Sequence, residues 1–369
     1  MAEASIEPTA RQGLMYSEYL DRFRRSSEFV VIPLLALVAS AALFSLFLML
    51  VGKSPVEFFS LVWRGGFGTG FSWQNTLVRA SPLIFAALCV AIPARLGMVV
   101  IGGEGALILG GFAAGAIAIP LVPIASNVLV MPAMFLAAAI AGGVWIGFVG
   151  WLRHYRGINE TISSLLLFYI ATSVLNFFVE GALRDPSDPN KPSTAPIGAE
   201  NMIGPIPGTS VHWGLAFGVI ACLLVWVLMN RTTFGFAARL TGGNVRAAQG
   251  QGLPVGKLVL VSCALAGALA GIAGYFEVAA IHGKANASLI AGYGFTGILV
   301  SFLARHNPLA IIPVAIMLGG IASSGGLVQR RMDLPDATVL VLQGMMFLVL
   351  LVSETMYGRL PFFKPKGTT

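Results

Sequence analysis

The chain has 369 residues, of which 56% are hydrophobic and only 11% charged, with 44 glycines and a formal net charge of +7. This composition is expected where lipid rather than water is the solvent, and it argues against a soluble globular protein. The basic residues are scattered over several short loops rather than clustered, so the positive charge does not indicate a nucleic-acid-binding surface.

The apolar segments predict an all-α fold, a polytopic membrane helix bundle of about ten transmembrane helices. A segment needs roughly 20 apolar residues to cross a hydrocarbon core about 30 Å thick. The segment at 289–303 is too short to span straight, and we expect a half-helix buried among its neighbours, because lipid-facing backbone must be hydrogen-bonded internally. The candidate segments are 29–51, 76–94, 98–119, 128–152, 161–179, 211–229, 258–281, 289–303, 309–326 and 337–356.

The distribution of Lys and Arg predicts that both termini are cytoplasmic and that the helix count is even. With the N-terminus inside, 15 of the 23 basic residues face the cytoplasm and 8 face outside. The inner set is Arg11, Arg22, Arg24, Arg25, Arg95, Arg153, Arg156, Arg231, Arg239, Arg246, Lys257, Arg305, Arg359, Lys364 and Lys366, and the outer set is Lys53, Arg64, Arg79, Arg184, Lys191, Lys284, Arg330 and Arg331.

This orientation divides the chain into a cytoplasmic segment at 1–28, a transmembrane domain at 29–356 and a cytoplasmic tail at 357–369. The first 28 residues carry several acidic side chains and no compact apolar stretch, so they do not resemble a cleavable signal peptide. The loop at 180–210 is rich in Pro, Asp, Asn and Ser and is expected outside. The loop at 230–257 is expected inside.

The sequence does not contain the residue arrangements that catalysis or metal binding usually requires. The four histidines make no paired metal-ligand spacing, and no Gly-x-Ser-x-Gly nucleophile motif occurs. The dipeptide Gly256-Lys257 is not a phosphate loop, because Gln251 and Leu258 stand where that motif needs Gly and Ser or Thr. Cys89, Cys222 and Cys263 fall inside apolar segments as small hydrophobes. We expect no catalytic residue, metal site, cofactor or ATPase site in this chain.

Two carboxylates, Glu104 and Glu277, are expected at membrane depth, where charge is costly and functional use is the default hypothesis. Glu104 stands among glycines, so it could instead cap a broken helix start, and Glu277 could simply be in water near the outer end of its segment. The pair Asn159-Glu160 has a similar alternative, since both residue types suit the start of a helix.

The sequence from Gly292 to Gly297 fits Gly-x-Gly-x-x-Gly, but no strand precedes it and no soluble nucleotide-binding unit surrounds it. Close helix packing or a local break in the helix explains it better, since freed carbonyls can line a polar cavity. The stretch from Arg239 to Gly252 is polar and rich in Gly and Ala. We interpret it as a helix that sits in a groove of a partner subunit, with a solvated connector as the alternative.

Several motifs occur in one order between about residue 77 and residue 350. They are Pro82-Leu83-Ile84, Ile101-Gly102-Gly103-Glu104-Gly105-Ala106, Gly157-Ile158-Asn159-Glu160-Thr161-Ile162, Gly242-x-Asn244 with Ala247-Ala248, and Gly292-Tyr293-Gly294-Phe295 with Gly297-Ile298. Together they resemble membrane permeases of bacterial ABC importers, in the branch that serves ribose-like sugars, branched-chain amino acids and nucleosides. The Asn159-Glu160 turn and Arg184-Asp185-Pro186 are most similar to the nucleoside-uptake permeases. Val100 and Ala106 depart from the family's usual Asn and Gln, which removes two hydrogen-bonding groups near Glu104.

The resemblance implies a multi-pass protein of the bacterial inner membrane. It pairs with a second permease chain, identical or different, with ATPase subunits that bind ATP-Mg, and with an external substrate-binding lipoprotein. By position, Gly242, Asn244, Ala247, Ala248 and Gly252 would form the element coupled to the ATPase. The residues expected along the substrate pathway are Glu104, Asn159, Glu160, Tyr293 and Phe295.

Other functions remain open at this point. The cargo could be a simple sugar such as ribose rather than a nucleoside. An ion-coupled secondary transporter would need more intramembrane carboxylates than Glu104 and Glu277. A membrane enzyme would need a catalytic constellation that the sequence does not contain.

Overall fold

The computed structural model describes residues 31–188 and 190–356. The predicted cytoplasmic segments 1–28 and 357–369 lie outside the described residues. The cytoplasmic location of these segments and of their basic residues therefore stays a prediction. The described chain is helical. After a first helix at Val31–Leu50, its α-helices are α2 (Pro55–Gly66), α3 (Gly70–Ala94), α4 (Gly103–Leu121), α5 (Asn127–Arg156), α6 (Glu160–Glu180), α7 (Gly214–Arg231), α8 (Thr233–Gly243), α9 (Val245–Gly250), α10 (Val255–Phe276), α11 (Tyr293–Leu303), α12 (Pro308–Ser323), α13 (Gly325–Met332) and α14 (Thr338–Glu354).

The predicted helical membrane bundle is confirmed. Eight described helices are long and apolar enough to cross a membrane, and two shorter apolar helices, at Ala287–Leu303 and Thr338–Glu354, bring the set to the predicted ten. The segment at 289–303 is short, as predicted. The last segment, predicted to span over 337–356, forms a helix of 17 residues.

The largest boundary error is at the start of α3, which begins at Gly70 rather than at residue 76. The side chain of Thr69 accepts a hydrogen bond from the backbone N–H of Ser72 at 3.1 Å and so caps the helix. Hydropathy alone does not locate this start, because a cap satisfies orphan N–H groups without any apolar residue.

The chain forms two compact units, residues 59–336 and residues 1–58 with 337–369. In the described part of the unit that contains residues 1–58, the ring centroids of Phe44 and Phe58 are 4.9 Å apart. In the unit at 59–336, α3 is the central helix, buried almost without interruption from Ala80 to Pro93. Helices α5 and α10 pack closely through glycines, since a Cβ atom on Gly267 would lie only 2.1 Å from the carbonyl oxygen of Gly142. The small residues thus let these two helices approach closely.

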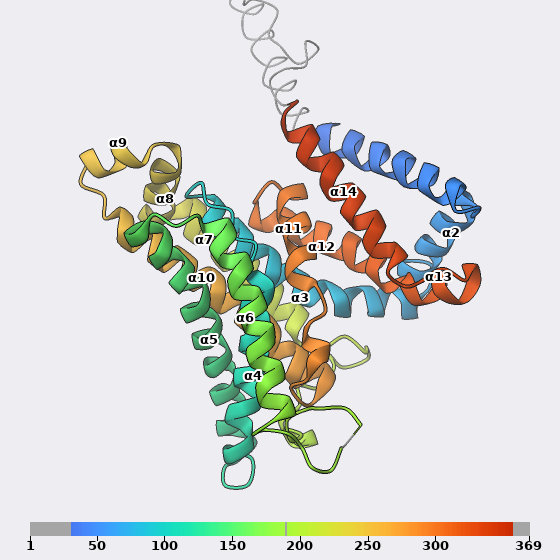
Figure 1. Ribbon diagram of the computed structural model, residues 1–369, viewed down its shortest axis with the longest axis horizontal. Coiled ribbons are helices and arrows are strands. Elements are labelled where there is room, and N and C mark those ends of the chain that lie inside the picture. The colour runs from blue at the N-terminus through green and yellow to red at the C-terminus, as the bar shows by residue number, and fades with distance from the viewer. Residues whose placement is uncertain (1–30, 189, 357–369) are drawn as a thin grey trace, which may run out of the picture. The chain divides into compact units, whose positions relative to one another are not determined.

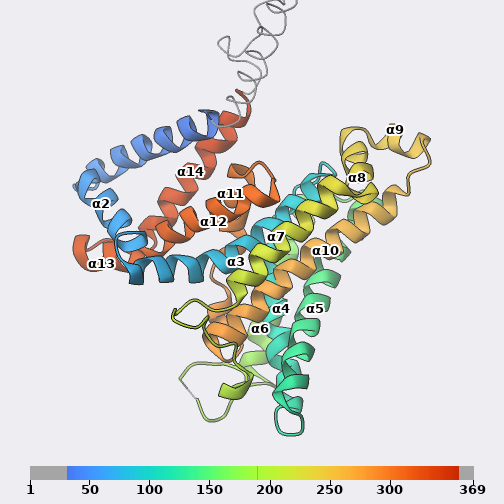
Figure 2. The same ribbon diagram turned by 180° about the vertical axis from the view of Figure 1, so that it is seen from behind.

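Within the unit at 59–336, the two regions predicted as loops at 180–210 and 230–257 lie at opposite ends (Figures 1 and 2). Both views show α8 and α9 beyond the ends of α7 and α10, while the loop between α6 and α7 lies at the other end of the same helices (Figures 1 and 2). The predicted orientation places α8 and α9 in the cytoplasm and the loop between α6 and α7 outside, and both placements stay predictions. The three described cysteines are free and buried, as predicted.

Candidate functional site

A polar cavity of about 470 Å³ lies between α3, the end of α10, the start of α11 and α12. Its wall combines charged, polar and aromatic side chains, which distinguishes it from other hollows of the unit, whose lining is mostly apolar. The lining residues are Asn75, Val78, Arg79, Glu277, Ile281, His282, Ser288, Ala291, Tyr293 and Ser323. This is the candidate substrate site.

Glu277 is the buried acid of the cavity. It is 2% exposed, so the alternative that it simply lies in water does not hold. Its Oε2 lies 3.5 Å from His282 Nε2, and among the described residues Oε1 has no hydrogen-bond partner although it is buried. Both residues belong to a π-helical turn at Glu277–His282 that follows α10, and such turns are frequent at functional sites. A free, buried carboxylate oxygen beside a cavity can accept a hydrogen bond from a substrate hydroxyl or N–H group.

Hydrogen bonds between the outer loop and residues 283–286 hold the rim of the cavity next to His282. The backbone N–H groups of Thr194 and Ile197 donate to the carbonyls of Ala285 and Gly283, both at 2.9 Å. Lys284 Nζ donates to Asp188 Oδ2 at 2.8 Å, and this hydrogen bond lowers the pKa of Asp188. The cavity therefore lies toward the end of the bundle that is predicted to face outside.

The predicted aromatic pair, Tyr293 and Phe295, is separated by the structure. Tyr293 lines the cavity. Phe295 is 39% exposed, and its ring packs edge-to-face against Phe168 of α6 with centroids 5.1 Å apart. Residues two apart on a helix point to nearly opposite sides, so only Tyr293 can offer its ring to a ligand in this cavity.

Glu104, the leading pathway candidate, does not line the cavity. It is fully buried, and its carboxylate accepts hydrogen bonds from the backbone N–H of Gly292 at 2.6 Å and from that of Gly294. It therefore caps the N-terminus of α11, whereas its own helix α4 begins at Gly103 after the N-cap position Gly102, which provides no side-chain cap. The capping alternative raised by the sequence thus applies, but to a different helix, 188 residues away in the chain.

Asn159 and Glu160 lie at the start of α6, also away from the cavity. The Asn159 side chain accepts hydrogen bonds from the backbone N–H groups of Thr161 at 2.9 Å and Ile162 at 3.1 Å, so it is the N-cap. Glu160 pairs with Arg153 Nε at 3.2 Å. Asn159 therefore caps its helix, which is one of the two interpretations that the sequence left open. The other oxygen of the Glu160 carboxylate accepts from the backbone N–H of Val99 at 3.4 Å, so Glu160 contacts neighbouring elements rather than capping α6.

The predicted coupling loop folds into α8 and α9, joined by Asn244. This residue ends α8, and its side chain accepts a hydrogen bond from Ala247 N at 3.0 Å, which starts α9. Ala247 is exposed whereas Ala248 is 3% exposed. Gly252 has a φ of 78° and turns the chain toward α10. Of the five predicted residues, Ala248 alone is buried, whereas Gly242, Asn244, Ala247 and Gly252 are exposed.

Sequence reasoning missed Arg79, Asn75, His282 and Ser288 as lining residues. A signal existed for Arg79, because it falls inside the apolar segment predicted at 76–94 although its charge was assigned to the external side. An arginine within a membrane segment usually faces a polar cavity. Asn75 is far in the sequence from His282 and Ser288, and only the fold brings it to the same cavity.

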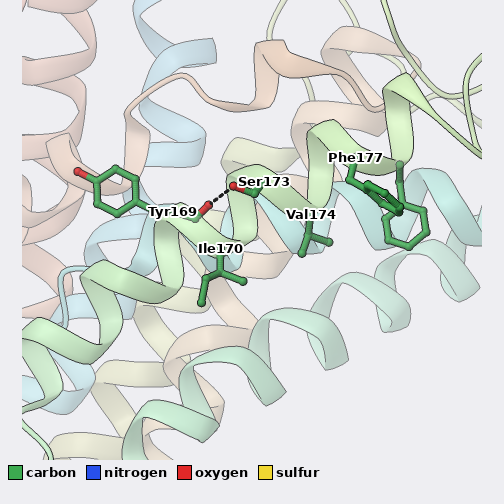
Figure 3. A pocket seen from close by; sticks show the side chains of 6 residues that line it. Tyr169, Ile170, Ser173, Val174 and Phe177 are labelled. Carbon is green, nitrogen blue, oxygen red and sulfur yellow. Dashed lines mark hydrogen bonds between the residues drawn. The ribbon is translucent and has the colours of Figure 1, made fainter.

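A second hollow, of about 410 Å³, lies along the outer face of α6 and is built almost entirely from apolar side chains (Figure 3). Its members include Tyr169, Ile170, Val174 and Phe177. The hydroxyl of Ser173 donates to the carbonyl of Tyr169 at 2.9 Å, so it offers little to a polar ligand. This surface suits contact with lipid or with another apolar helix and is not a site for a hydrophilic cargo.

Comparison with known proteins agrees with the membrane fold. Residues 72–351 match the family described as the permease component of branched-chain amino acid transport systems. The chain is 31% identical to a glucose ABC transporter permease of Haloferax volcanii, over 87% of each chain. It is 29% identical to a guanosine ABC transporter permease of Bacillus subtilis, over 79% of this chain and 84% of that one. It is 25% identical to a nucleoside ABC transporter permease of Lactococcus lactis, over 78% and 81%. The chain belongs to this permease family and is a multi-pass cell-membrane subunit of an ABC importer, not itself catalytic.

Proposed function

We propose that this permease carries nucleosides, delivered by an external binding protein, across the membrane when partner ATPase subunits bind and hydrolyse ATP. The cavity beside Tyr293 is the observation that supports this cargo best. It offers an aromatic ring next to a buried carboxylate and an arginine, and a nucleoside has both a base with a π-face and a sugar with hydroxyl groups. Two of the relatives are named for guanosine and nucleoside transport.

The polar residues of the cavity suit weak, reversible binding. Glu277 Oε1 can accept from a ribose hydroxyl or a base N–H, and Arg79 can donate to a ring nitrogen or carbonyl of the base. Tyr293 supplies the stacking surface, which tolerates any base because every base has a π-face. A permease must release its cargo, so affinity belongs to the binding protein and the cavity holds the ligand only in passing.

The energy source in this proposal is external to the chain. ATP-Mg binds on two ATPase subunits, and this chain binds no cofactor of its own. Helices α8 and α9 dock on the ATPase, with Ala247 at the contact. A second permease chain, identical or different, completes the pathway.

A simple sugar is the second candidate cargo. The 31% identity to the glucose permease favours it, and Glu277, Arg79 and Asn75 could bind sugar hydroxyls without any aromatic ring. Tyr293 separates the two candidates, because stacking adds binding energy for a base and much less for a small polyol.

The test is uptake of radiolabelled guanosine, uridine, ribose and glucose by cells that express the complete importer, with wild-type permease and with Tyr293→Leu. We expect nucleoside uptake in the wild type and a several-fold loss in the variant, since a lost stacking partner costs about 1–3 kcal/mol per base. Tyr169→Leu, on the exposed face of α6, is the matched control and should transport normally. Uptake of glucose but not of nucleosides by the wild type would assign the sugar as cargo.

A further inference from the structure

The turn after α3 touches two elements that are distant in the sequence. On one side, Arg95 Nη2 donates a hydrogen bond to the backbone carbonyl of His306 at 3.1 Å, in the turn between α11 and α12. On the other side, the carbonyl of Arg95 lies against Gly242 of α8, where an added Cβ atom would be only 2.3 Å from that oxygen. Arg95 therefore stands between the predicted docking helices and α11.

The contact of this turn with α8 is close. Gly242 packs backbone against backbone, and the carbonyl oxygen of Gly242 would in turn meet a Cβ on Gly97 at 3.4 Å. The pKa of Arg95 is lowered mainly by burial and also by the positive charge of Arg239 on α8. Among the described residues, the buried Nε of Arg95 has no hydrogen-bond partner, so the bond to His306 is the polar contact that holds this guanidinium in place.

The turn that receives this hydrogen bond is stiff. Arg305 and His306 have φ values of 50° and 55°, in the left-handed region that residues other than glycine adopt only when their surroundings hold them there. The backbone N–H of His306 donates to the carbonyl of Ser301 at 2.7 Å, and His306 Nδ1 lies 2.9 Å from Ser301 Oγ. A displacement of this turn must therefore move the end of α11 with it.

Helix α11 connects this turn to the cavity. It has 11 residues and so is about 16 Å long at 1.5 Å per residue. Its last turn contains Ser301, and its first residue is Tyr293, which lines the cavity. A single short helix thus spans the distance from the inner turn to the candidate substrate site.

We propose that Arg95 is a positioning residue that ties the ATPase-docking helices to α11, so that a displacement of α8 is passed through Gly242, Arg95 and His306 to Tyr293. The inference rests on the proposed function as an ATP-driven importer. It requires that breaking one hydrogen bond at the inner end of α11 alters transport without removing the ATPase.

The experiment uses the complete importer in proteoliposomes, with wild-type permease, Arg95→Met and Arg156→Met. Met keeps most of the side-chain volume of Arg but cannot donate a hydrogen bond. Arg156 is an exposed arginine at the end of α5 and is predicted to be cytoplasmic, so it controls for the loss of one inner charge. Two quantities are measured, namely ATP hydrolysed and nucleoside transported in the presence of loaded binding protein.

For Arg95→Met we expect co-purification of the ATPase and basal ATP hydrolysis as in the wild type, with nucleoside transported per ATP reduced several-fold. Arg156→Met should keep the wild-type ratio. A second readout places a cysteine at Ala291 in the cavity and follows its labelling by a thiol reagent, since Cys89, Cys222 and Cys263 are buried. ATP should change the labelling rate in the wild type and leave it unchanged in Arg95→Met.

The proposal would be overturned if Arg95→Met transported as much nucleoside per ATP as the wild type and if ATP changed the labelling rate at residue 291 as much as it does in the wild type. If Arg95→Met does not assemble, Gly242→Ala tests the same path from the docking side, and a wild-type ratio in that variant overturns it equally. Absence of ATP-dependent uptake by the wild-type complex would be a different result, because it contradicts the proposed function itself.

Discussion

Glu104 accepts a hydrogen bond from the backbone N–H of Gly292 at 2.6 Å, although the two residues are 188 positions apart. The bond joins the start of α4 to the start of α11, and Gly294 donates to the same carboxylate. Helix N-termini carry partial positive charge and unpaired N–H groups, so a buried carboxylate is stabilised there. Glu104 thus fixes the end of α11 that presents Tyr293 to the cavity.

The first prediction concerns Glu104→Gln. The amide has one acceptor oxygen and an NH₂ group, so it can accept from one backbone N–H but turns a donor toward the other. We expect the complex to assemble and nucleoside uptake to fall several-fold, because the start of α11 is loosened. The binding protein's own affinity for ligand should not change. Normal uptake by Glu104→Gln, with loss of assembly in Glu104→Leu, would assign Glu104 a purely structural role.

The second prediction concerns Gly294, whose contact with α4 has no space for a side chain. A Cβ atom there would lie 2.3 Å from the backbone nitrogen of Glu104 and 2.6 Å from its Cα. Backbone atoms cannot move aside as a flexible side chain can, so Gly294→Ala should destabilise the permease by roughly 1–3 kcal/mol. The measurement is the thermal unfolding midpoint in detergent, which should fall by several degrees.

Gly344→Ala in α14 is the control for Gly294→Ala, because a Cβ atom there meets nothing within 4 Å. Ala is favoured over Gly within a helix, so this variant should keep or slightly raise the unfolding midpoint. Equal midpoints for both variants would mean that α4 and α11 do not approach as closely as described.

The sequence predicts the bundle well because transmembrane helices carry their main signal locally. A run of about twenty apolar residues can be recognised from the local sequence alone, without knowing which helix it packs against. The short segment at 289–303 can be recognised in the same way. The start of α3 at Gly70 was missed because capping by Thr69 leaves no apolar signal.

The candidate site was less predictable, because a cavity is a relation between distant segments. Tyr293 was found through its glycine-rich motif. Glu104 and Asn159 were singled out by their residue types, yet both cap helices. The sequence does not distinguish an intramembrane carboxylate that accepts hydrogen bonds from backbone N–H groups from one that faces a cavity. Arg79 and Glu277 were both visible as charges in apolar segments, but their shared cavity required the fold.

The third prediction separates docking from self-packing at α9. Ala247 is exposed and Ala248 is 3% exposed within the chain, so a double substitution would mix two effects. Ala247→Glu should leave membrane insertion and the unfolding midpoint unchanged but reduce ATPase co-purification and uptake, since a packed groove tolerates little extra volume. Wild-type co-purification and uptake by Ala247→Glu would identify the loop as a mere connector.

Ala248→Glu is the contrasting variant. It places a charge in the packing of the loop itself, which is costly without a partner. We expect it to lower the unfolding midpoint of the isolated permease, which Ala247→Glu should not do.

The fourth prediction concerns pH. Burial, followed by the positive charges of Arg95 and Arg305, lowers the pKa of His306 to about 4. The unfolded chain, with an ordinary histidine pKa near 6.5, takes up a proton first as the pH falls. Stability should therefore be complete above about pH 6.5 and be lost progressively between about pH 6.5 and pH 4, by on the order of 1–2 kcal/mol at pH 5.

His306→Asn removes this titration and keeps a residue that tolerates the left-handed backbone. The unfolding midpoint of the wild type should drop more than that of the variant between pH 7 and pH 5. An equal drop in both would show that His306 is not the group responsible.

The central claim is that ATP hydrolysis by partner subunits, and not an ion gradient, drives nucleoside uptake through this chain. The most direct measurement is radiolabelled guanosine uptake into proteoliposomes that contain either the permease alone or the permease with its ATPase subunits, second permease chain and loaded binding protein. We predict uptake only by the complete complex and only with ATP-Mg, with the isolated permease inert under sodium and proton gradients. Gradient-driven guanosine uptake by the isolated chain would contradict the account and indicate a secondary transporter.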